Sequence, residues 1–155
     1  MKKIDSLNQV AEFHRTFNAP ILETPQIPSK ERCELRVSLL QEELNELKQA
    51  IEDNDLVEIA DALCDLQYVL SGAVLEFGLG EKFVELFNEV QRSNMSKACD
   101  TELQAQETVE HYKAKGEEAF YEKSGNKFNV HRISDNKVLK NKYYSAADLK
   151  SIIEK

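Results

Sequence analysis

The segment 56–77 constrains the fold of this 155-residue chain more than any other part of the sequence. Its apolar side chains recur nearly all round a helical wheel, so a helix formed here would be buried on most of its sides. A chain of this length offers few neighbouring helices that could cover such a surface. We therefore expect a helical bundle in which this helix also contacts another subunit.

One narrow acidic stripe interrupts that apolar surface. Glu58, Asp61 and Asp65 fall within an arc of about 60° on the helical wheel. The preceding helix, expected at about 29–53, carries a second acidic cluster made of Glu42, Glu43 and Glu46. Because a short turn joins the two helices, we expect them to pack antiparallel and to bring the two clusters together.

The distribution of charge along the chain indicates what these clusters could bind. The chain has 20 Lys and Arg residues against 28 Asp and Glu residues, yet no basic residue lies between Lys48 and Lys82. Helix faces that point to solvent usually mix both signs. Carboxylates packed between apolar residues without basic partners repel one another, and a divalent cation removes that cost. The pattern therefore indicates a site for Mg²⁺, or for Mn²⁺. The alternative is that both clusters are solvated faces of a non-catalytic helical interaction module.

Composition also excludes some partners. A formal net charge of -8 argues against a nucleic-acid polymer and against an anionic membrane surface. No apolar run approaches the roughly 18 residues of a membrane span, and no signal-peptide pattern follows Met1. We expect a cytoplasmic protein.

The remaining pattern predicts a mostly α-helical chain with a small β element. Helical spacing of apolar residues indicates further helices at about 5–17, 81–95 and 101–115. Short β-prone runs between turn residues indicate a hairpin or meander within 119–139. Ser145 is expected to cap a terminal helix that ends near Ile153. We assign 1–97 to a helical core, and 98–155 to a C-terminal elaboration packed on the same domain.

Several motifs resemble the all-α nucleoside triphosphate pyrophosphohydrolases, a superfamily that includes the MazG proteins, the dimeric dUTPases and phosphoribosyl-ATP pyrophosphohydrolase. Its EExxE…ExxD signature matches Glu42–Glu46 followed by Glu58–Asp61. Only 11 residues separate Glu46 from Glu58, which is at the short edge of the family spacing. The resemblance continues at 61–70, 89–97 and 13–20, so it covers roughly 10–97. It implies a four- to five-helix bundle of the MazG-like type.

The resemblance also implies an activity. Such a protein would hydrolyse a ribo- or deoxyribonucleoside triphosphate to the monophosphate and pyrophosphate with Mg²⁺, and would thereby clear surplus or non-standard nucleotides. It would act as a homo-oligomer, either a dimer or a tetramer. A second enzymatic alternative is hydrolysis of a phosphorylated metabolite such as phosphoribosyl-ATP.

Residue roles follow from the same resemblance. The implied metal ligands are Glu43, Glu46, Glu58 and Asp61, with Asp65 as a further ligand or as a group that orients one. Glu42 and Glu43 are both candidates for the base that activates the attacking water, and the choice between them is open. The expected substrate contacts are Arg92 and Lys97 to the phosphates, Asn94 to the sugar or base, and His14 and Phe17 at the border of a base pocket.

Overall fold

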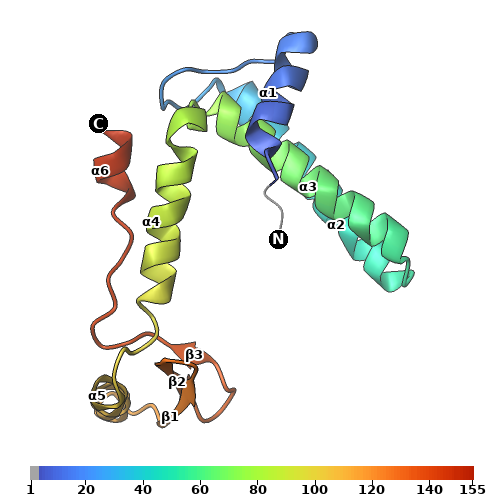
Figure 1. Cartoon of the computed structure of the whole chain (residues 1–155). Coiled ribbons are helices and arrows are strands. Elements are labelled where there is room, and N and C mark those ends of the chain that lie inside the picture. The colour runs from blue at the N-terminus through green and yellow to red at the C-terminus, as the bar shows by residue number, and fades with distance from the viewer. Residues whose placement is uncertain (1–3) are drawn as a thin grey trace. The chain divides into compact units, whose positions relative to one another are not determined.

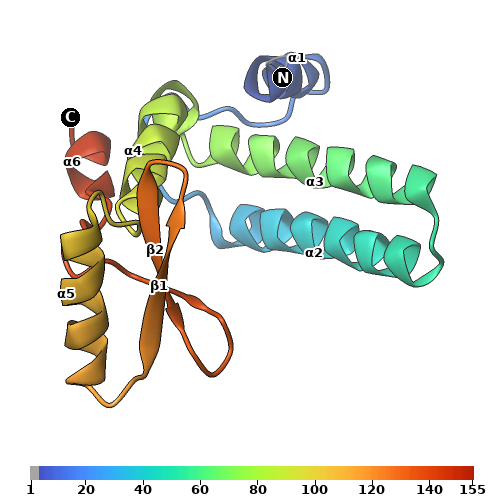
Figure 2. The same ribbon diagram turned by 60° about the horizontal axis from the view of Figure 1, so that its bottom comes forward.

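The structure is a computed structural model that describes residues 4–155, and it confirms the expected fold class: mostly helical, with a small C-terminal sheet and a terminal helix (Figures 1 and 2). Within these residues no single helix combines the length and the apolar character needed to cross a membrane; α3 and Gly80–Met95 pass that test only as a bent pair. In chain order the elements are α1 (Ser6–Thr16), α2 (Lys30–Glu52), α3 (Leu56–Glu76), η1 (Gly80–Lys82), α4 (Phe83–Met95), α5 (Glu102–Lys113), β1 (Ala119–Ser124), β2 (Lys127–Arg132), β3 (Val138–Leu139) and α6 (Leu149–Ile153).

The chain divides into two compact units, the first ending at Phe83 and the second running from Val84 to Lys155. The assignment of 1–97 to one helical core stays a prediction. We describe the two units separately.

In the first unit, α2 and α3 form an antiparallel hairpin, and α1 packs against α3 (Figure 2). Side-chain caps fix the helix starts where the sequence predicts them. The Ser29 hydroxyl accepts a hydrogen bond from the backbone N–H of Arg32, and the Asp55 carboxylate accepts two, from Val57 and Glu58. Such caps satisfy backbone donors that have no partner inside the helix. The hairpin turn is therefore set by local chemistry.

The proline-rich loop between α1 and α2 crosses the end of α3. The backbone N–H of Leu22 donates to the carbonyl of Leu75, which places the loop against the last turn of α3. Gly78 follows the C-terminal end of α3 and has a φ of +68°. A Cβ at this position would lie 1.9 Å from the carbonyl oxygen of Thr24 in the loop. Only glycine satisfies both the backbone conformation and the close approach.

The second unit contains a three-stranded antiparallel sheet in the order β1-β2-β3, beside α5. Its buried core consists of Cys99, Ala105, Val130 and Leu139. The predicted cap of the terminal helix is wrong: α6 begins at Leu149, and the Asp148 carboxylate accepts from the Ser151 N–H. Ser145 does not cap α6, because its own N–H donates to the hydroxyl of Ser96 and fixes it in the preceding loop.

Candidate functional site

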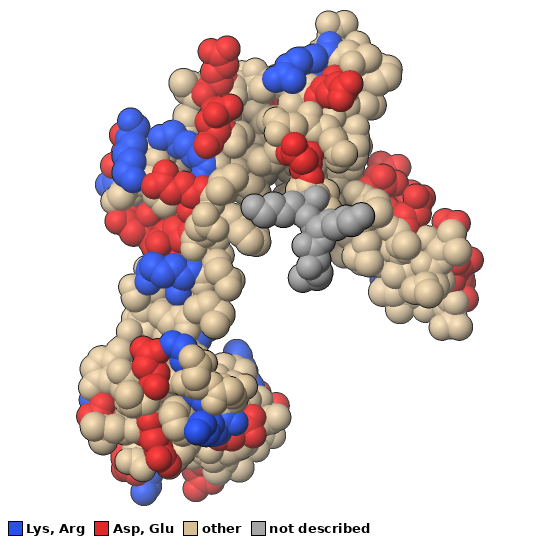
Figure 3. Space-filling view, viewed as in Figure 1, with Lys and Arg blue, Asp and Glu red and all other residues tan. Residues whose placement is uncertain are grey.

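The predicted carboxylates lie along the α2–α3 hairpin, where Figure 3 shows acidic side chains gathered. Glu43 is half-buried on α2, whereas its neighbour Glu46 is exposed. Burial raises the pKa of the Glu43 carboxyl, and the negative charges of Glu46, Asp65, Glu42 and Asp61 raise it further. Because Asp61 and Asp65 belong to α3, carboxylates of the two helices lie within electrostatic reach of each other.

This carboxylate cluster consists of Glu42, Glu43, Glu46, Glu58, Asp61 and Asp65. Within residues 4–155, no Lys, Arg or His forms an ion pair with any of its members. In the same range no three His, Cys, Asp or Glu side chains are close enough together to hold a metal ion. The donors are nevertheless of one kind, hard carboxylate oxygens whose mutual repulsion is uncompensated. Such a donor set fits Mg²⁺.

A second charged group lies near the other end of the hairpin, and sequence reasoning missed it. Glu76 on α3 is 1% exposed and accepts hydrogen bonds from Arg32, whose Nε is 3.0 Å away, and from Arg36. Burial opposes ionisation of Glu76, but the two guanidinium groups outweigh it and keep the Glu76 pKa below its ordinary value.

The expectation that carboxylates of the segment between Lys48 and Lys82 lack basic partners is therefore wrong at Glu52, which pairs with Lys48, and at Glu76. The partners of Glu76 come from α2, 40 and 44 residues earlier in the chain. The signal available in the sequence was the spacing of Arg32 and Arg36, which lie four residues apart and so share one face of α2.

His14 belongs to this buried group and links α1 to it. Its Nδ1 lies 2.8 Å from the Pro20 carbonyl oxygen and donates to it, which leaves Nε2 to accept from Nη2 of Arg36 at 3.4 Å. A Cβ at Gly72 of α3 would meet Nη1 of Arg36 at 2.7 Å and Nε2 of His14 at 3.0 Å. Side chains of α1 and α2 therefore pack directly against α3 at Gly72.

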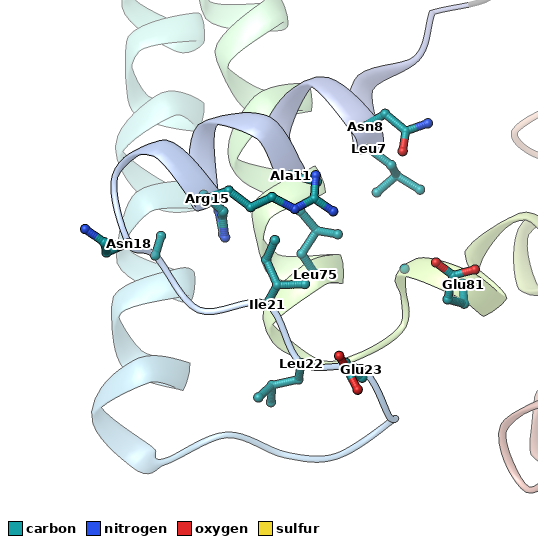
Figure 4. Close-up of a pocket in the computed structure, with 13 residues that line it drawn as sticks. Leu7, Asn8, Ala11, Arg15, Asn18, Ile21, Leu22, Glu23, Leu75 and Glu81 are labelled. Atoms are coloured by element: carbon teal, nitrogen blue, oxygen red, sulfur yellow. The ribbon is translucent and has the colours of Figure 1, made fainter.

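His14 also lines a pocket of about 710 Å³, shown in Figure 4, but its side chain is 2% exposed and both ring nitrogens are engaged. The pocket lies along the flank of α1 that carries Ala11 and Arg15, and the loop residues Ile21 and Glu23 form another wall. None of the residues in the carboxylate cluster lines it.

Phe17, the other residue expected at a base pocket, is the C-cap of α1 and lies beside a different flank of that helix. Its ring is 4.4 Å from that of Phe13, centroid to centroid. Phe13 in turn meets Tyr68 of α3 edge-on, at 5.6 Å and an interplanar angle of 85°. Phe17 is thus part of an aromatic cluster with Phe13 and Tyr68.

The three residues expected at the phosphates and sugar lie in the second unit. Arg92 donates two hydrogen bonds to Glu89, at 2.8 and 2.7 Å, and a third to the carbonyl of Ala146. Lys97 donates to the Asn94 side-chain oxygen at 2.7 Å. Arg92 therefore attaches the C-terminal segment to α4, a role that its sequence context did not indicate.

Basic side chains also surround Tyr144. Its hydroxyl lies 3.0 Å from that of Ser93, and the Lys140 ammonium lies 4.3 Å above its ring. The Ser93 hydrogen bond lowers the pKa of Tyr144, and the positive charges of Lys140, Lys97 and Arg92 add to that effect. The positive charges near Tyr144 therefore come from α4, from the residue Lys97 that follows it, and from the segment between β3 and α6.

Two comparisons place the chain among known proteins. The family model of phosphoribosyl-ATP pyrophosphohydrolase matches residues 10–94, more than half of the chain and all of the carboxylate cluster. An uncharacterized protein of Acanthamoeba polyphaga mimivirus is 24% identical, and the match covers 99% of this chain and 97% of that relative.

Proposed function

Because the chain belongs to the phosphoribosyl-ATP pyrophosphohydrolase family, and so is a hydrolase of phosphoric anhydrides, we propose that it is a Mg²⁺-dependent nucleoside triphosphate pyrophosphohydrolase. The products are the nucleoside monophosphate and pyrophosphate. The observation that carries this proposal is the carboxylate cluster, whose charges repel one another across α2 and α3 and have no ion-pair partner among the described residues. A polyanionic substrate binds to such a surface only when cations reverse its sign.

The residues that would hold Mg²⁺ are Glu43, Glu46, Glu58 and Asp61, with Asp65 beside them. A cation held by these residues would offset phosphate charge and would supply an activated water as the nucleophile. A carboxylate that ligates a cation is a poor proton acceptor, so we assign the role of base to Glu42. Glu42 is exposed and adjacent to Glu43, so it can accept a proton from a water at the edge of the cluster.

A second candidate substrate is phosphoribosyl-ATP, because the matching family model carries that name. Both substrates contain a phosphoric anhydride next to a nucleoside, and the carboxylate cluster does not discriminate between them. The choice depends on groups that contact the base and sugar.

One experiment tests the proposal and separates the candidates. The protein is incubated with ribo- and deoxyribonucleoside triphosphates and with phosphoribosyl-ATP, with Mg²⁺, with Mn²⁺ and without metal, and pyrophosphate is measured. We expect metal-dependent release that is lost in Glu46→Gln and Asp61→Asn. Glu34→Gln is the matched control, because Glu34 lies on α2 like Glu46 but outside the carboxylate cluster, and this variant should retain activity. Absence of metal-dependent release from every compound would leave the non-catalytic interaction module as the better interpretation.

We also propose that the protein is a homo-oligomer. On α3 the exposed apolar residues Leu56, Leu63 and Leu70 recur every seven positions, and on α2 a second such series consists of Val37, Leu44 and Ile51. Apolar side chains at this interval form a continuous seam along a helix, which a helix of another subunit can cover.

A further inference from the structure

The aromatic cluster of Phe13, Phe17 and Tyr68 is accessible to solvent at all three side chains. The exposed fractions are 42% for Phe13, 65% for Phe17 and 39% for Tyr68. Large aromatic side chains gain most when they are buried, so three that contact one another while their faces remain accessible indicate a ligand-binding surface. Phe13 meets Tyr68 edge-on, so this contact does not stack the two rings face to face. The contact of Phe13 with Phe17 covers part of the ring surface, and the exposed fractions show that aromatic surface remains accessible to a planar ligand.

The aromatic cluster adjoins the carboxylate cluster on the same helix. Tyr68 follows Asp65 by three residues and Asp61 by seven, so all three side chains share one face of α3. Along the helix axis these separations correspond to about 4.5 Å and about 10.5 Å. A ligand that touches the cluster with a planar group can therefore extend a charged group toward Asp61 and Asp65.

The other candidates for a base-binding surface in the first unit are less suitable. The pocket of Figure 4 is lined by Ala11 and Arg15, which lie on the flank of α1 opposite Phe13 and Phe17. His14 is buried, and both of its ring nitrogens already have partners. The aromatic cluster is the surface that continues the acidic stripe.

We propose that Phe13, Phe17 and Tyr68 bind the nucleobase of the substrate by stacking. The inference rests on the proposed function in one respect, namely that cations at the carboxylate cluster hold the phosphates of the same molecule. Stacking tolerates any base because every base has a π face. The aromatic cluster thus supplies affinity for nucleotides over simple polyphosphates, and selection among bases requires further groups.

The test measures binding rather than turnover. Isothermal titration in the presence of Mg²⁺ uses two probes: a nucleoside triphosphate with a methylene bridge between the α and β phosphorus atoms, and inorganic triphosphate, which has no base. We expect Phe13→Leu and Tyr68→Leu each to weaken binding of the nucleotide probe roughly tenfold, the range of a lost base–aromatic stack, and to leave inorganic triphosphate unchanged. Tyr68→Phe, which keeps the ring, should bind the nucleotide probe like the wild type.

Phe120→Leu is the matched control, since Phe120 is 39% exposed on β1 in the second unit, and we expect no change for either probe. The proposal is overturned if the variants leave nucleotide affinity unchanged, if they weaken both probes equally, or if the wild type does not bind the nucleotide. Loss of self-association with unchanged nucleotide affinity would assign the surface to a second copy of the chain. Wild-type binding that follows this pattern without metal-dependent pyrophosphate release would contradict the proposed function alone.

Discussion

At the scale of single residues, the first unit contains two kinds of carboxylate with opposite surroundings. Glu76 is buried between two guanidinium groups, and its pKa is lowered. Glu43 is half-buried among other carboxylates, and its pKa is raised. The first arrangement stabilises the folded chain by itself, whereas the second is costly until a cation joins it. The two residues should therefore respond differently to neutralisation.

We expect Glu76→Gln to lower the free energy of unfolding by about 3–5 kcal/mol, because buried Arg36 and half-buried Arg32 would lose their common counter-charge. Urea denaturation monitored by circular dichroism measures this. Glu34→Gln, which removes an exposed pair with Lys30, should change stability by about 1 kcal/mol at most. Similar small effects in both variants would show that the buried network contributes little.

Glu42→Gln and Glu43→Gln should separate a base from a metal ligand. We expect Glu42→Gln to lower kcat by roughly 10²- to 10⁴-fold with little change in the Mg²⁺ concentration needed for half-maximal activity. Glu43→Gln should raise that concentration, because it removes an oxygen ligand. Steady-state kinetics across a Mg²⁺ series distinguishes the two. The reverse pattern would exchange the roles.

At the scale of elements, the sequence predicts features that depend on residues close together in the chain. It misses features that depend on contacts between distant segments. Helices α2, α3 and α5 begin close to the predicted positions, at caps formed by Ser29, Asp55 and Thr101, because a cap and its donors lie within three residues of each other. Ser145 fails as a cap because it bonds to Ser96, 49 residues away. In the candidate site, helical periodicity brings the carboxylates to one face, but the aromatic cluster depends on contacts between α1 and α3.

The contact of the loop between α1 and α2 with Gly78 gives a testable prediction at this scale. Gly78→Ala should lower the free energy of unfolding by more than Gly125→Ala does. Both glycines have positive φ, which costs an L-residue roughly 1–2 kcal/mol, but only at Gly78 does the new Cβ collide with a backbone carbonyl. Thermal unfolding of the two variants measures the difference. Equal losses would mean that the loop moves aside at no cost.

The attachment of the C-terminal segment to α4 should depend on pH. Arg92 and the backbone N–H of Asp148 lower the pKa of Glu89 to about 2, from an ordinary value of 4.5. The ionised carboxylate therefore stabilises this contact fully above about pH 4.5, and the contribution is lost as the pH falls toward 2. Hydrogen exchange of amides at 146–152 should report the release. Glu89→Gln should expose these amides at neutral pH, and identical profiles in variant and wild type would contradict the assignment.

At the scale of the whole molecule, association of subunits determines whether the apolar faces of α2 and α3 remain in water. We expect Leu44→Glu combined with Leu63→Glu to convert the oligomer to a monomer, because each change places a charge in one of the seven-residue series. Sedimentation velocity measures the mass. Ile27→Glu, at an exposed apolar position outside both helices, should leave it unchanged. A wild-type protein that sediments as a monomer would contradict the proposed assembly.

The close meeting of three helices at Gly72 has a consequence for substrate choice. Nη1 of Arg36 on α2 and Nε2 of His14 on α1 both lie against this glycine. Movement of α1 along α3 would break the hydrogen bond between His14 and Arg36, and Arg36 is itself held by its ion pair with Glu76 of α3. The aromatic rings and the acidic side chains are thereby held at a fixed spacing before any ligand arrives. Under the proposed binding mode, we therefore expect the first unit to disfavour ligands in which the span from the planar ring to the anionic groups is too short or too long.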